Sequence, residues 1–131
     1  VPVMPQLRKI ACIEGAYVLK DNEHATHFDD SVGLLADWRK SGYVWEIPYR
    51  TLFPANGLGG LLAAGRCSSA SGDAWEVTRV IPSAAMTGQV AGLAASLAID
   101  AGKEPGEISV SNLQDELRKL GFAIHFADIG L

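Results

Sequence analysis

The segment that most constrains the fold is residues 83–101, which predict one long helix with small side chains along one side. Pro82 is tolerated in the first turn, because the N–H group that it lacks would be unpaired there, and Gly102 supplies the stop. Small residues recur at spacings of four and three and form a smooth stripe. The stripe consists of Ala84, Gly88, Gly92 and Ala95 or Ser96. Bulkier side chains occupy the remaining positions, so we expect a helix that is buried on most sides.

Two regions before this helix have the composition of β-strands. Residues 10–13 and 17–19 are apolar and are separated by Gly15, which indicates strand segments with a bend. Residues 43–47 place three large apolar side chains on one face by period-two alternation, and Pro48 then limits further pairing. We expect these two regions to pair as antiparallel neighbours.

A dense turn signal at residues 54–60 marks the best internal boundary of the chain. The short apolar run Leu61–Ala64 follows, flanked by glycines, and this pattern favours a buried strand.

The C-terminal part predicts an amphipathic helix. Ser111 and Gln114 have capping-box spacing, and Gly121 is its stop. Residues 122–126 are a weaker candidate for a final strand. The leucines expected on one stripe of the helix are Leu113, Leu117 and Leu120.

Composition and charge limit the kinds of binding partner and the cellular compartment that we expect. With 131 residues, of which 48% are hydrophobic and 20% charged, the chain is expected to be one globular domain by length. A net charge of -4 argues against a nucleic-acid partner, which would require a basic patch. Cys12 and Cys67 show no paired spacing, so neither a disulfide framework nor a zinc motif is expected, and free thiols suit a cytoplasmic protein.

The N-terminal residues 1–5 lack an initiator methionine and the pattern of a signal peptide, which suggests a processed or truncated chain. The Gly-x-x-x-Gly spacing of Gly88 and Gly92 also occurs in membrane-spanning helices. Polar Gln89 and a terminal Asp100 argue against insertion, so no membrane partner is expected.

The chemistry of residues 65–88 suits a flavin. Reduction of the flavin accumulates negative charge near its N1 and C2 carbonyl, and helix N-termini and arginines stabilise that charge. Gly65 would let backbone approach the ribityl chain or pyrophosphate, and Arg66 would neutralise phosphate. The chain has no Gly-x-Gly-x-x-Gly turn after a strand. The expected cofactor-binding residues are Gly65, Arg66, Arg79, Val80, Ile81, Pro82, Ser83 and Gly88.

Four ordered motifs resemble the C-terminal region of a family of FAD-dependent oxidoreductases, of the glutathione-reductase-like type with two dinucleotide-binding domains. The motifs are Ile47–Leu52, Leu61–Ala70, Arg79–Pro82 and Gly88–Ala94, and their order and spacing agree without gaps from Leu61 to Ala94. Residues 5–8 and 15–19 are similar to the preceding cap region of that family. The resemblance covers most of residues 5–120.

The resemblance implies an α+β fold. Residues 1–60 would belong to an antiparallel β-rich cap, and residues 61–101 would supply the closing strand and helix of a Rossmann-type FAD domain. Residues 102–131 would form a C-terminal helical tail. The chain departs from the family pattern where Ala11 and Cys12 replace an arginine pair of the cap and Gly72 replaces a loop histidine. Substrate chemistry carried by those positions is therefore in doubt.

Several side chains have a structural alternative beside the functional one. Arg79 would contact the flavin or anchor a loop by a salt bridge, and Arg50 would bind an anionic substrate or pair with a carboxylate. These two arginines are the catalytic candidates. Cys67 is expected to be a small buried thiol. Trp75 is expected to be a core anchor, or to border a flavin or substrate pocket.

The polar segment 23–30 contains His24 and His27 beside three carboxylates, which superficially suits a metal ion. Such clusters on polar loops are usually solvated surface. No metal site is therefore expected there.

The main hypothesis is that the chain is the C-terminal part of an FAD-dependent oxidoreductase. FAD would be the cofactor of the parent protein and would be absent from the isolated chain. Its partners would be the missing N-terminal FAD segment and an unknown small-molecule substrate. The isolated chain would be inactive and would form homo-oligomers through exposed apolar surface. The alternatives are a non-enzymatic, self-associating module and one subunit of a split flavoenzyme.

Overall fold

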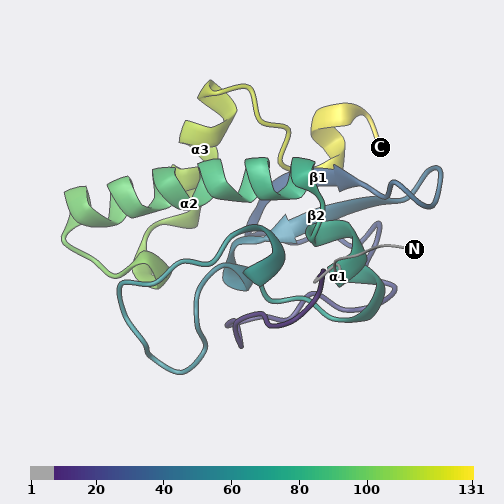
Figure 1. Ribbon diagram of the computed structural model, residues 1–131. Coiled ribbons are helices and arrows are strands. Elements are labelled where there is room, and N and C mark those ends of the chain that lie inside the picture. Colours follow the sequence, from purple (N-terminus) through teal and green to yellow (C-terminus); the bar gives the residue numbers. More distant parts are fainter. Residues whose placement is uncertain (1–7) are drawn as a thin grey trace.

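The computed structural model describes residues 8–131, so the resemblance expected at residues 5–7 lies outside the described residues. The described part has an α+β architecture, with a two-stranded antiparallel sheet and three α-helices joined by short 3₁₀ turns (Figure 1). The sheet consists of β1 (Ser31–Ala36) and β2 (Val44–Pro48), and the α-helices are α1 (Gly72–Thr78), α2 (Ile81–Ala101) and α3 (Val110–Lys119). The 3₁₀ turns are η1 (Tyr49–Thr51), η2 (Gly65–Cys67), η3 (Pro105–Glu107) and η4 (Phe126–Ile129).

The strand expected at residues 43–47 is confirmed as β2, but its expected partner is wrong. β2 pairs antiparallel with β1, whereas residues 10–19 contribute only isolated bridges at Gly15 and Leu19. The sequence of β1 conceals this strand because Gly33 lies in its interior, where glycine weakens strand propensity. A Cβ atom at Gly33 would lie 2.7 Å from the sulfur of Met86 on α2, so a larger residue there would displace the Met86 side chain.

The long helix α2 begins close to the predicted residue, and its stop at Gly102 is confirmed. Gly102 has a left-handed backbone with φ of 61°, and Lys103 N–H donates to the carbonyl of Ala98 at 2.9 Å. The expectation that α2 is buried on most sides is wrong. The stripe with Gly88 and Gly92 faces solvent, and no other described part of the chain lies within 4 Å of a Cβ atom built at either glycine. The buried face instead consists of Ser83, Thr87, Val90, Ala94 and Ala98.

The helix expected in the tail is confirmed as α3, with a different N-cap. The Ser109 hydroxyl accepts a hydrogen bond from Asn112 N–H at 3.3 Å, so the cap precedes the predicted Ser111 by two residues. Gly121, with φ of +87°, donates to the carbonyl of Arg118 and ends the helix as predicted.

Two predicted short strands are wrong. Leu61–Ala64 is extended coil, in which Ala63 N–H donates to the carbonyl of Leu52 at 2.7 Å. Residues 122–126 lead into the 3₁₀ turn η4. A strand requires a neighbour that pairs with it residue by residue, and no described segment supplies one to either run.

One buried core unites the three predicted parts of the chain. In Figure 1, α2 runs along the molecule, with α3 and the C-terminal segment on one side and the loop of residues 53–64 on the other. The Gln114 amide of α3 donates to the carbonyls of Asp29 and Ser31 at 2.8 and 2.9 Å, which attaches α3 to β1. The division at residues 60 and 101 stays a prediction. Core residues come from all three parts, as shown by Leu19, Ile47, Leu52, Val77, Val90, Ala94, Leu113, Leu117 and Ile124.

Among the described helices, none alone has the length and hydropathy of a membrane span. α1 and α2 meet those criteria only as a pair, and the two are bent by 79° at the break between them.

Candidate functional site

The turn η2 is fixed against the first turns of α2 by a chain of hydrogen bonds. Gly65 N–H donates to the Thr87 hydroxyl at 2.8 Å, and that hydroxyl donates to the carbonyl of Ser83 at 2.7 Å. Gly65 has φ of +64°, and a Cβ atom there would lie 3.1 Å from Cβ of Ala84. Both the left-handed backbone and the close packing therefore favour glycine at this turn.

Replacing Gly65 with alanine is expected to destabilise the chain by about 1–3 kcal/mol, because alanine is strained at positive φ and crowds Ala84. Urea unfolding of the variant measures the loss. Gly42→Ala is the matched control, since Gly42 has φ of +80° with nothing within 4 Å of its Cβ position. Equal losses in the two variants would show that the contact with Ala84 contributes nothing.

The N-terminus of α2 is open. Its N-cap, Val80, has an extended backbone (φ of -84°, ψ of 164°), and no side chain of the described residues caps the first turn. Ile81 is 83% exposed, and Pro82 has no N–H group to offer. The hydroxyl of Ser83 is buried and has no hydrogen-bond partner among the described residues. Buried polar groups are usually paired, so an orphaned hydroxyl at an uncapped helix N-terminus is a candidate ligand contact.

The two arginines nearest this junction are held by the segment between η2 and α2. Arg79 Nε donates to the Glu76 carboxylate at 2.6 Å, and Lys9 lies 2.5 Å from the same carboxylate. Lys9, together with Arg79, holds the pKa of Glu76 below its usual value. The Trp75 indole N–H donates to the carbonyl of Arg66 at 3.0 Å, which closes the loop over residues 66–79. Arg79 thus has the structural ion pair that the sequence offered as an alternative, and its contact with a flavin stays a prediction.

Arg50, the second catalytic candidate, pairs with Asp30. Its Nε and Nη2 atoms donate to the two carboxylate oxygens at 2.9 and 3.0 Å, and this hydrogen-bonded pair raises the pKa of Arg50. The guanidinium also lies 5.0 Å from the ring centroid of Tyr17. The carboxylate partner offered as an alternative is confirmed, and it occupies the Nε–Nη2 edge of the guanidinium, which is one of the edges that a substrate carboxylate could use.

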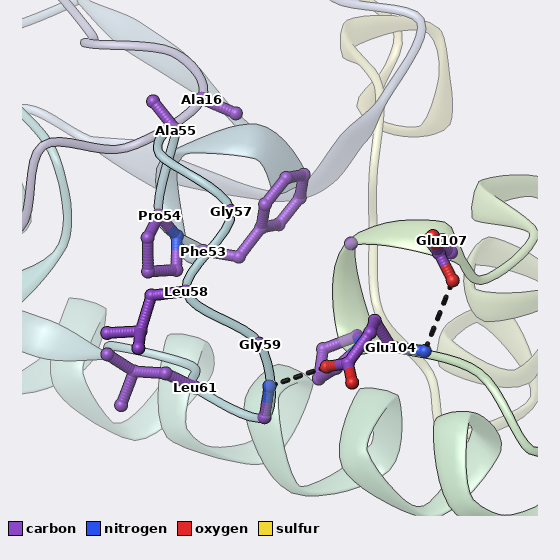
Figure 2. A pocket seen from close by; sticks show the side chains of 13 residues that line it. Ala16, Phe53, Pro54, Ala55, Gly57, Leu58, Gly59, Leu61, Glu104 and Glu107 are labelled. Atoms are coloured by element: carbon purple, nitrogen blue, oxygen red, sulfur yellow. Dashed lines mark hydrogen bonds between the residues drawn. The ribbon is translucent and has the colours of Figure 1, made fainter.

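A separate cavity of about 300 Å³ lies between the loop of residues 53–61 and η3. Glu104 reaches across it and accepts a hydrogen bond from Gly60 N–H at 2.5 Å, while Leu58 and Leu61 lie together on the opposite side (Figure 2). Its lining includes none of the expected cofactor-binding residues. The carboxylates of Glu104 and Glu107 at its edge disfavour a phosphate group, so we place the candidate cofactor site at the η2–α2 junction instead.

A comparison with protein-family models identifies the family of this chain. A family model described as FAD dependent oxidoreductase matches residues 7–117, which is most of the chain and includes the whole η2–α2 junction. The chain belongs to this family of FAD-dependent oxidoreductases. The same comparisons found no matching relative among curated proteins and no matching solved structure.

Family membership makes FAD the cofactor to test against this junction. The uncapped first turn of α2 and the unpaired Ser83 hydroxyl fit the electron-rich pyrimidine edge of a flavin. Gly65 fits less directly, because its N–H group is already taken by Thr87. Gly88 lies on the exposed stripe of α2, and no described residue outside the helix lies within 4 Å of its Cβ position.

Sequence reasoning missed two residues that shape the η2–α2 junction. Thr87 fixes Gly65, and Glu76 holds Arg79. The spacing of Glu76 and Arg79, three residues apart, is a helical ion-pair signal that could have been found. The pairing of Thr87 with Gly65 had no such signal. Cys67, expected to be buried, is exposed.

The polar segment 23–30 does not gather as one cluster. The ring of His24 stacks on Tyr43 with centroids 3.9 Å apart, and Glu23 accepts the Tyr17 hydroxyl at 2.5 Å. His27 instead lies 3.3 Å from both Asp29 and Glu46.

Proposed function

We propose that the η2–α2 junction supplies one side of the FAD site of an oxidoreductase. The observation that carries this proposal is the uncapped N-terminus of α2 with the unpaired Ser83 hydroxyl, in a chain of the FAD-dependent family. Helix N-termini with free N–H groups stabilise negative charge, and a reduced flavin concentrates negative charge on its pyrimidine edge.

Each residue of the junction has a role in this proposal. The first-turn amides after Val80 and the Ser83 hydroxyl donate to the pyrimidine edge, and Arg79 adds positive charge beside them. Arg66, which is exposed on η2, neutralises phosphate. Bound FAD supplies the capacity to accept a hydride or electrons from a substrate. The chain's own residues bind and orient it.

The rest of the cofactor site comes from a glycine-rich turn outside these 131 residues. The exposed stripe of α2, with Gly88 and Gly92, is the surface that this second segment covers, because small residues permit close backbone approach. Together the two segments complete a Rossmann-type FAD domain. Without the second segment the chain is inactive.

The full-length gene product that contains these residues is expected to purify yellow, with one equivalent of FAD per chain. The absorption spectrum of the released flavin measures the stoichiometry. A colourless product that takes up no added FAD would contradict the proposal.

The role of Arg79 is tested in the same protein. Arg79→Ala is expected to lower the reduction potential of the bound FAD, because it removes a positive charge beside the edge where the reduced flavin accumulates negative charge, while Glu76 keeps its pair with Lys9. Arg118→Ala on α3 is the matched control, since Arg118 is exposed and pairs only loosely with Asp115 at 3.8 Å. An unchanged potential in Arg79→Ala would assign that residue to the structural ion pair alone.

A further inference from the structure

A buried carboxylate gathers two histidines from distant parts of the chain. His27 precedes β1, Glu46 lies in β2, and His125 lies just before η4. The Nδ1 atoms of His27 and His125 lie 3.3 and 3.2 Å from the same oxygen, Oε1 of Glu46. All three atoms lie within 4.8 Å of one another. Two imidazole nitrogens and one carboxylate oxygen therefore converge on one point.

We propose that His27, Glu46 and His125 bind a divalent transition-metal ion, with Zn²⁺ as the best fit. Bonds of about 2.0 Å to nitrogen and oxygen give a tetrahedral edge of about 3.3 Å, which matches both Nδ1–Oε1 distances. His27, whose side chain is 59% exposed, is free to rotate and close the remaining gap between the two nitrogens. Imidazole ligands select Zn²⁺ and similar ions over Ca²⁺ or Mg²⁺, which prefer oxygen.

The hydrogen bonds around the cluster orient the ligand atoms. Glu46 is fully buried, and its second oxygen accepts Phe28 N–H at 2.7 Å, which fixes the carboxylate. Nε2 of His27 lies 3.3 Å from an Asp29 carboxylate oxygen. A proton on Nε2 leaves the lone pair of Nδ1 directed at Glu46, as in carboxylate–histidine–zinc arrangements.

The crowding of Oε1 also favours a cation. Besides the two histidine nitrogens, this oxygen receives Phe126 N–H at 3.1 Å, so three nitrogen atoms surround one carboxylate oxygen. A divalent ion would accept the lone pairs of both Nδ1 atoms, with the proton of each ring on Nε2, while Phe126 N–H keeps its hydrogen bond to Oε1. With three protein ligands, the fourth position opens toward solvent beside His27.

The cluster shares no residue with the proposed FAD junction. Its ligand His125 also lies beyond residue 117, where the family match ends. The metal would attach the C-terminal tail to β2, because Glu46 is in β2 and His125 and Phe126 are in the tail.

Titration of the tag-free 131-residue chain with Zn²⁺ tests the proposal by isothermal calorimetry. We expect saturable uptake of one equivalent and a rise in thermal midpoint as Zn²⁺ is added, because a ligand bound only by the folded state stabilises it. Co²⁺ in place of Zn²⁺ is expected to give the visible absorption of a four-coordinate ion. These measurements need no FAD, so their outcome is independent of the proposed flavin role.

His27→Gln and His125→Gln are each expected to weaken Zn²⁺ binding by roughly tenfold or more. His24→Gln is the matched control, because His24 stacks on Tyr43 and takes no part in the cluster. Circular dichroism checks that the exposed His27 variant is folded. Absence of stoichiometric Zn²⁺ uptake by the unmodified chain, or an equal loss in His24→Gln, would overturn the proposal and leave a hydrogen-bonded clamp.

Discussion

Replacing Leu117 with alanine is expected to destabilise the chain by about 2–5 kcal/mol, which is a large part of the stability of a domain this size. Leu117 is fully buried on α3 and belongs to the core that also contains Ile47 and Val90. Truncation removes apolar contacts and leaves a cavity that the surrounding helices and sheet only partly fill. Urea unfolding monitored by tryptophan fluorescence measures the change.

Leu120→Ala is the control on the same helix. The sequence placed Leu117 and Leu120 on one stripe, yet Leu120 is 66% exposed at the C-terminal end of α3. Its truncation is expected to cost about 0.5 kcal/mol or less. Comparable losses in the two variants would show that α3 does not pack on the core in this orientation.

The helices α2 and α3 were predictable because their signals are local, whereas α1 was not predicted. Pro82 and Gly102 bracket α2, and Gly121 ends α3, through backbone geometry that each residue imposes on its own turn. Burial around the helix was less predictable. The bulky positions suggested contacts on most sides of α2, but Ile99 is 80% exposed, because the apolar surface of a helix does not reveal whether a neighbour covers it.

The strands were harder because a strand is defined by its partner. The alternation at residues 43–47 identified β2 correctly, while the partner β1 contains Gly33, which packs beside Met86 from a segment more than fifty residues away. The run Leu61–Ala64 has the composition of a buried strand and lacks a partner within the described chain. Composition alone cannot distinguish these two cases.

The candidate site was predictable where it depends on the order of motifs, and not where it depends on tertiary contacts. The order of the motifs placed Gly65 and Ser83 in one candidate junction, and their contact with a flavin stays a prediction. The hydrogen bond between Gly65 and Thr87, separated by 22 positions, did not. The same holds for Glu46 and His125, which lie 79 positions apart and meet only because the tail folds back over β2.

Substituting leucine for Gly88 or Gly92 is expected to have opposite effects in two settings. In the 131-residue chain, each substitution should stabilise α2 by about 0.5–1 kcal/mol, because leucine has the higher helix propensity and both positions face open space. Thermal unfolding of the chain measures this gain. A loss instead would mean that self-association or another contact already covers the stripe.

In the complete flavoprotein that we propose, the same stripe lies against the glycine-rich FAD segment. Leucine at Gly88 or Gly92 would then hold the two backbones apart, and we expect FAD affinity to fall roughly tenfold or more, since inserting several methylene groups into a packed contact costs about 1–3 kcal/mol. Ser96→Leu tests how far the covered region extends along the helix, because Ser96 is exposed one turn beyond Gly92. Full retention of FAD in both glycine variants would show that the second segment binds elsewhere. A gain in stability of the chain, together with a loss of FAD affinity in the flavoprotein, would place the second segment on this face of α2.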